Sequence, residues 1–232
     1  MSSESAEPAL QAVRVWDLPT RVFHWLLTVT AIGSVVTGLS GGNAMVWHVR
    51  LGLVVLALLA FRVVWGFAGG HWSRFASFVY GPRSVIAYLR GDDGPGGRYD
   101  IGHSPLGALS VWALLCLLAL QVATGLVADD EVATTGPLNR FVAANTATAA
   151  SAWHEGFGKT LLIVLMIVHV AAVVYYLWRR QRNRVSPMIH GDMLLPAHAS
   201  ASNDGAGARL AAFVIAGLAA ALAWWVGSLG AP

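Results

Sequence analysis

Four of the eight histidines in the chain lie within or at the ends of strongly apolar segments, namely His24, His48, His154 and His169. Neutral imidazole is among the commonest metal ligands in proteins. A single histidine of this kind is explained equally well as a structural hydrogen-bonding residue of a membrane helix. The four histidines together are harder to explain in that way, because they form two pairs whose members lie at the same depth along the apolar segments. His24 and His169 form an inner pair, and His48 and His154 form an outer pair.

The spacing of the last two histidines sharpens this interpretation. His154 and His169 stand 15 residues apart, which corresponds to about 22 Å along a helix axis and returns to within about 60° of the same face. One helix therefore offers two imidazoles to a bundle interior at two heights. Two stacked six-coordinate haems require this arrangement, with each iron held by imidazoles from two helices. Zinc is the competing interpretation, but tetrahedral zinc needs three or four ligands at one point.

Cysteine usage narrows the cofactor chemistry further. The chain has one cysteine, Cys116, inside the apolar run LLCLL. This excludes a disulfide framework, a thiolate-held iron–sulfur cluster and a c-type haem attached through CxxCH. The haems expected here are therefore non-covalent haem b. The sequence shows no nucleophile–base arrangement and no phosphate-binding loop, so we predict no catalytic residue.

The elements that position these histidines are predicted to be membrane helices. The chain is 56% hydrophobic and 12% charged, with a mean hydropathy of +0.60, whereas soluble domains are about 25% charged. These values exclude disorder and disfavour a soluble enzyme. A membrane span needs roughly 20 apolar residues. Five segments qualify: Val22–Leu39, Val46–Phe67, Pro105–Val127, Phe157–Trp178 and Leu210–Leu229. The predicted fold is an all-α integral membrane bundle, with a four-helix core and a fifth C-terminal span.

Basic residues predict the orientation of the bundle. Eleven of them flank one side of the spans, whereas the other side carries only Arg50, Arg140 and Lys159. The positive-inside rule places the N-terminus in the cytoplasm and the C-terminus outside. Because the arginines follow span ends rather than one polar face, membrane lipid is the expected partner and nucleic acid is not. The connections are expected to hold an amphipathic segment at Ser84–Leu89, an outer helix within Ala128–Trp153 and a polar linker at Asn183–Ala208.

Three arginines are further candidates for the haem sites. Arg21 and Arg50 lie close to His24 and His48 in sequence and could pair with haem propionates, although Arg21 fits a positive-inside flank equally well. Arg62 lies deeper than a snorkelling arginine requires. Glycines could give a flat haem room beside the helices, and ordinary close helix packing explains them equally well. These glycines are Gly33, Gly38, Gly52, Gly107 and Gly125.

Several motifs together resemble the bacterial cytochrome b561 family, which includes the cytochrome b subunit of nickel–iron hydrogenases. They are VWDLPTRVFHW, WHVRLG, GHSPLGALSVWALLCLLALQVATGL and the pair WHE…HV, within about Val13–Asp192. The resemblance implies a four-helix core with two haems, which we place in a domain at 1–192. The linker at 193–209 and the last helix at 210–232 depart from that core. The resemblance also implies that His24, His48, His154 and His169 are the axial ligands. His103, in GHSPLG, would lie near the inner haem and a quinone, or would be a polar residue opening its span.

The function expected from the resemblance is electron transfer across the bacterial cytoplasmic membrane, between the quinone pool and a periplasmic redox partner. That partner would be a hydrogenase-like subunit or a cytochrome c. An electron-transfer subunit of a respiratory oxidoreductase is favoured over a stand-alone enzyme. Two alternatives remain open at this point, namely a stand-alone superoxide–quinone oxidoreductase and a non-haem membrane anchor or metal-transport subunit.

Overall fold

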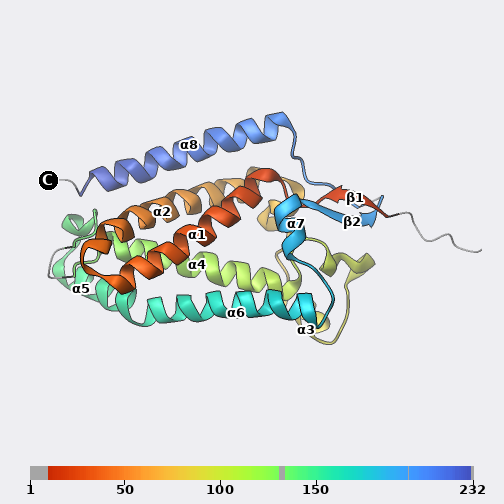
Figure 1. Cartoon of the computed structure of the whole chain (residues 1–232), viewed down its shortest axis with the longest axis horizontal. Helices are drawn as coiled ribbons and strands as arrows, with labels where there is room; N and C mark the ends of the chain where they lie inside the picture. Colours follow the sequence, from red (N-terminus) through yellow and green to blue (C-terminus); the bar gives the residue numbers. More distant parts are fainter. Residues whose placement is uncertain (1–9, 131–133, 198, 231–232) are drawn as a thin grey trace, which may run out of the picture.

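The computed structural model describes residues 10–130, 134–197 and 199–230. Four long helices form the core, namely α1 (Leu18–Ser40), α2 (Met45–Ala68), α4 (Pro105–Val127) and α6 (Gly158–Trp178). A fifth, α8 (Ala206–Ser228), lies along α2 on the outside of this core (Figure 1). All five predicted spans are confirmed as helices long and apolar enough to cross a membrane. The fold is the predicted all-α membrane bundle.

Shorter elements connect the spans. The helix α3 (Pro82–Leu89) confirms the expected amphipathic segment, and α5 (Ala144–Ala152) confirms the helix expected between the third and fourth spans. The chain runs from α5 into α6 through one π-helical turn, Trp153–Phe157. The 3₁₀ turns are Gly42–Ala44, His71–Ser73, Phe75–Ser77, Pro95–Asp100 and Asn139–Phe141.

The starts of α1 and α4 follow from their local sequences. Asp17 caps α1 by accepting a hydrogen bond from the backbone of Thr20 at 2.8 Å, and Pro19 occupies the first turn. Ser104 caps α4 in the same manner, immediately before Pro105. A capping oxygen satisfies an otherwise free N–H, and proline in the first turn has no N–H to satisfy. Both helices therefore start at fixed residues beside the candidate histidines His24 and His103.

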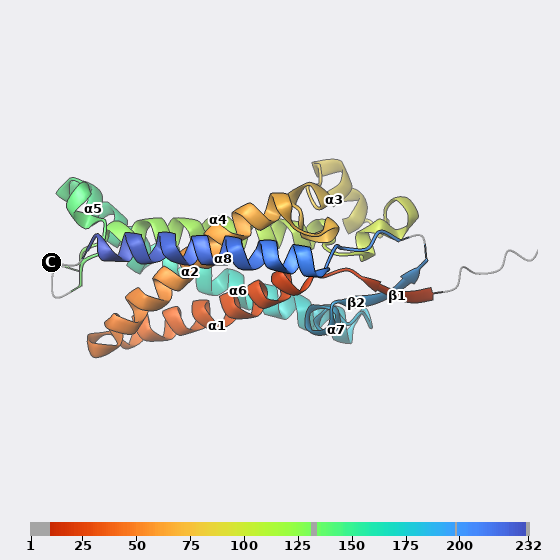
Figure 2. The same cartoon turned by 90° about the horizontal axis from the view of Figure 1, so that it is seen from above.

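A small antiparallel sheet covers one end of the bundle, which we call the sheet end. Strand β1 (Leu10–Arg14) pairs with β2 (Asp192–Pro196), so that Arg14 lies opposite Asp192. A short helix, α7 (Val185–His190), precedes β2. The segment predicted as a polar linker therefore contains regular structure. Strand β2 also extends across the expected boundary between the domain at 1–192 and the linker at 193–209. The opposite end of the bundle, which carries α5, is the α5 end (Figures 1 and 2).

The sheet forms because its apolar side chains alternate toward a small core. Leu195 is buried with Val13, Val15, Trp16 and Trp72, whereas the neighbouring Leu194 is 71% exposed. This period of two is the pattern of a strand with one buried face. Five residues on each side are too few to stand out among spans of more than twenty, which is why the sequence pattern did not reveal the sheet.

An ion cluster ties the fifth helix to the core at the sheet end. Asp204 accepts hydrogen bonds from Arg14 at 2.6 Å and from Arg209 at 3.1 Å, and also from the backbone N–H of Leu18 at 3.0 Å. Burial raises the pKa of Asp204, but the hydrogen bonds from Arg209 and Leu18 outweigh it and leave the pKa below its ordinary value. The starts of α1 and α8 therefore share one carboxylate.

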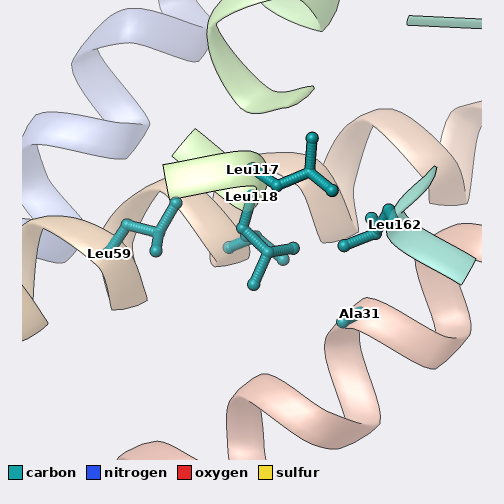
Figure 3. Close-up of a cluster of buried hydrophobic side chains, with 6 residues drawn as sticks. Ala31, Leu59, Leu117, Leu118 and Leu162 are labelled. Carbon is teal, nitrogen blue, oxygen red and sulfur yellow. The ribbon is translucent and has the colours of Figure 1, made fainter. Parts of the chain in front are cut away.

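The middle of the bundle is packed with aliphatic side chains. Ala31, Leu59 and Leu162 meet Leu117 and Leu118 there, one or two from each core helix (Figure 3). Large apolar side chains also cover the outside, for example Phe67 and Phe213. Such exposure is costly in water but not in a bilayer, where the surroundings are hydrocarbon. The aliphatic cluster divides the interior into two regions along its length.

Candidate haem sites

The outer histidine pair meets across a cavity at the α5 end. His48, in the first turn of α2, and His154, in the π-helical turn, line a cavity of about 450 Å³. Their ring centroids are 5.8 Å apart and their planes cross at 79°. Imidazole–metal bonds are about 2 Å long, so two rings on opposite sides of one metal have centroids roughly 6 Å apart. The separation fits a metal held between the two imidazoles.

Hydrogen bonds fix the tautomer of both rings. The Nδ1 atom of His48 lies 2.8 Å from the carbonyl oxygen of Ser34, and that of His154 lies 2.9 Å from the carbonyl oxygen of Gln121. A carbonyl only accepts, so each Nδ1 carries the proton and donates it. Each Nε2 then keeps its lone pair for a metal, the usual arrangement for ligating histidines. Both residues therefore fit the axial ligands of one haem iron.

Two of the five candidate glycines make room for these rings. A Cβ at Gly38 would lie 2.9 Å from Nδ1 of His48, and a Cβ at Gly125 would lie 2.8 Å from Cε1 of His154. Gly52 also lines the cavity and has open space beside it. Gly33 instead approaches Leu51, and Gly107 approaches the capping Ser104. Gly38, Gly52 and Gly125 therefore belong to the site. Gly33 serves helix packing, and Gly107 serves the cap of α4.

The cavity wall supplies a cation that the sequence pattern did not single out. Lys159 lines the cavity together with Glu155, and its positive charge acts on His154. Within the described ranges, Lys159 forms no ion pair. Arg50 is exposed, with its guanidinium 5.0 Å from the ring centroid of Trp47, and does not line the cavity. Lys159 is therefore a further candidate to pair with a haem carboxylate, and the role expected of Arg50 stays a prediction.

The inner pair lies toward the sheet end. His24, on α1, and His169, on α6, are close enough for their charges to interact. Nδ1 of His169 lies 3.3 Å from the hydroxyl of Ser110 on α4. Nδ1 of His24 is shielded from solvent and has no hydrogen-bond partner within the described part of the chain. His24 thus lacks the Nδ1 hydrogen bond that orients the two outer histidines, and its candidacy as a ligand rests on its proximity to His169.

His103 lies close enough to His24 and His169 for an electrostatic interaction. Its ring packs between those of Trp16 and Phe78, with centroid distances of 4.8 and 4.4 Å. Its Nδ1 atom is shielded and lacks a partner among the described residues. Burial, reinforced by the charges of Arg62 and His24, lowers the pKa of His103 to about 3. The ring is therefore neutral.

The two remaining arginine candidates bind the protein itself. Arg62 is 4% exposed, donates to the carbonyl oxygen of Ser73 at 3.0 Å and lies over the ring of Phe75. Arg21 donates to the carbonyl oxygen of Ile189 in α7 at 2.6 Å. Arg62 therefore braces the loop after α2, and Arg21 holds α7 against α1. Their expected roles at the haem sites stay predictions.

The sequence pattern alone does not identify the buried carboxylate of Asp17 at the sheet end. Asp17 is fully buried and accepts hydrogen bonds from the backbone of Thr20 and Gly70 and from the side chains of Trp65 and Ser73. Its place before Leu18-Pro19 is a helix-start signal. Its partners after α2 lie some fifty residues away in sequence, so the junction it makes is visible only in the fold.

The ligand chemistry favours haem over a bare metal ion. Within the described residues, no three His, Cys, Asp or Glu side chains gather as a metal-ion site. Zinc would need three or four such ligands, whereas a haem iron needs two axial ligands besides its porphyrin. Two separate histidine pairs in one bundle match the second requirement.

Comparisons with known proteins identify the family of this chain. Residues 15–191 match the family model described as prokaryotic cytochrome b561. A protein of Cupriavidus necator named "Probable Ni/Fe-hydrogenase B-type cytochrome subunit" is 24% identical over 215 residues, which cover 79% of this chain and 87% of that protein. A protein of the same name from Bradyrhizobium diazoefficiens is 22% identical, with 78% and 85% covered. The family match spans both histidine pairs and most of the bundle, and the chain therefore belongs to the prokaryotic cytochrome b561 family.

Proposed function

We propose that this chain holds two haems b and carries electrons across the bacterial cytoplasmic membrane, between quinone and a redox partner on the outer face. The observation that carries the proposal is the pair of histidine sites at opposite ends of one four-helix core. Haem supplies reversible one-electron chemistry when it is bound. In this proposal His48 and His154 ligate the haem at the α5 end, and His24 and His169 ligate the other.

The protein's own residues set the conditions for transfer. Ser34 and Gln121 orient the outer imidazoles, as Ser110 does for His169. Lys159 offers a positive charge to a haem carboxylate, as does Arg50 if its side chain turns inward. The aliphatic cluster around Leu117 and Leu118 separates the two sites. A dry aliphatic layer resists the passage of ions and protons, so charge would cross this layer as electrons.

The orientation and partner belong to the same proposal. The excess of arginine at the sheet end supports a cytoplasmic N-terminus, with the α5 end and the C-terminus outside. The relatives are named as hydrogenase cytochrome subunits, which supports a hydrogenase-like partner at the α5 end. Copurification with such a subunit would distinguish this role from a stand-alone superoxide–quinone oxidoreductase.

Proteoliposomes test the transfer directly. Vesicles that enclose ferricyanide, a one-electron oxidant that does not cross the bilayer, receive a quinol from outside. Each quinol gives up two electrons and two protons, and each enclosed ferricyanide takes up one electron. We expect the full-length protein to accelerate ferricyanide reduction beyond the rate in protein-free vesicles. His48→Ala and His24→Ala should each return the rate to that background, because either change interrupts the path. Equal rates for the three proteins would contradict the proposal.

A further inference from the structure

The helix that carries His154 is irregular at this residue. Trp153–Phe157 winds as a π-helical turn, and Gly156 within it has non-helical angles, φ −102° and ψ −111°. Such turns interrupt the regular hydrogen-bond ladder and occur frequently at functional sites. The turn presents His154 to the cavity. His48, by contrast, lies within the regular helix α2.

One residue of α4 holds His154 at two points. The carbonyl oxygen of Gln121 accepts from Nδ1 of the His154 ring at 2.9 Å. The side-chain Nε2 of Gln121 donates to the backbone oxygen of His154 at 3.1 Å. Both the ring and the main chain of the ligand are therefore tied to the same residue.

The surroundings are shaped for this contact. Gln121 is 7% exposed, and Gly125, one turn further along α4, admits the His154 ring. A Cβ at Gly158 would collide with Oε1 of Gln121, so the glycine at the start of α6 admits the amide. Gly125 thus makes room for the His154 ring, and Gly158 makes room for the Gln121 amide.

The amide side chain of Gln121 is energetically unfavourable at this buried position in α4. A buried amide loses its hydration and is tolerated only where hydrogen bonds replace it. Oε1 of Gln121 has no partner within the described ranges, so half of the amide is left unsatisfied. An apolar side chain of similar size would avoid this cost. A polar residue retained inside a span despite its cost points to a function.

We infer that Gln121 is a positioning residue that fixes the height and ring rotation of His154, and thereby the electronic properties of the haem at the α5 end. The inference rests on the proposed function, in which His154 is an axial ligand. Outer-sphere contacts of this kind orient metal-bound imidazoles and tune their metal.

The test compares Gln121→Met with the unaltered protein. Methionine keeps the side-chain length and removes the donor to the His154 carbonyl. We expect two haems to remain, with a shifted midpoint potential and a changed low-spin electron paramagnetic resonance signal for one of them. The other haem should be unaltered. The matched control is Thr30→Val, since Thr30 is another buried polar residue whose hydroxyl, among the described residues, bonds to carbonyls of its own helix.

Each outcome decides the inference. Unchanged potential and resonance signals in Gln121→Met would overturn it, as would equal shifts of both haems or the same shift in Thr30→Val. If Gln121→Met does not insert, Gln121→Asn takes its place, because the shorter amide does not reach His154 and should produce the same selective shift. Failure of the proposed function looks different. In that case His154→Ala would leave every haem signal of the protein in place.

Discussion

Replacing either His48 or His154 by alanine is expected to remove one and the same haem component from the redox and absorption spectra. Replacing His24 or His169 should remove the other component. The reason for the first pair is direct, since the two rings are 5.8 Å apart across one cavity. The second pair lies beyond the aliphatic cluster, toward the sheet end. Loss of one ligand from a bis-imidazole iron removes the low-spin site that the pair creates.

The control for this experiment is His190→Ala, because His190 lies in α7 and is exposed. An emptied cavity also costs stability, since its lining loses contacts. The comparison therefore uses variants that insert into the membrane and retain one haem. If His48→Ala and His24→Ala removed the same component while His154→Ala removed another, the proposed pairing of the histidines would be wrong.

Replacing Asp17 by alanine is expected to prevent stable folding at the sheet end. Asp17 accepts hydrogen bonds from four donors and is fully buried. Each buried donor left unsatisfied costs about 1–3 kcal/mol, so the combined loss in the free energy of unfolding is about 4 kcal/mol or more. Thermal unfolding in detergent, followed by tryptophan fluorescence and haem absorbance, measures this loss.

Two variants bracket the Asp17 result. Asp17→Asn keeps one acceptor oxygen and should fall between the unaltered protein and Asp17→Ala. Asp92→Ala removes an exposed aspartate that accepts one local hydrogen bond from the backbone of Gly94, and should change the midpoint temperature little. If Asp17→Ala melted at the same temperature as Asp92→Ala, the hydrogen bonds to Asp17 at the sheet end would not contribute to the stability of the protein.

The five spans are predictable from sequence because each is a long apolar run, and length and hydropathy alone decide whether a helix can cross a bilayer. The structure shifts their ends by at most four residues, for instance from Val22 to Leu18 at the start of α1. The sheet of β1 and β2 is different. Its strands lie about 180 residues apart, so their pairing depends on a register that no local pattern contains.

The depths of the four histidines are predictable for the same reason as the spans, because depth along a helix follows directly from residue number. Their supporting contacts are not predictable in this way. The position of Gln121 opposite His154 depends on how α4 packs against the π-helical turn. Lys159 follows that turn and lines the cavity. Proximity in sequence favoured Arg50 for the propionates, whereas the cavity wall contains Lys159.

Haem stoichiometry tests the central claim most directly. The purified protein is assayed for haem type and haem content per chain by the pyridine haemochrome method, and the haem is then extracted with acidic acetone. Two depth-separated histidine pairs and the absence of a CxxCH motif predict two haems b per chain, all of them extractable. One haem per chain, or haem that stays with the polypeptide after extraction, would contradict the account.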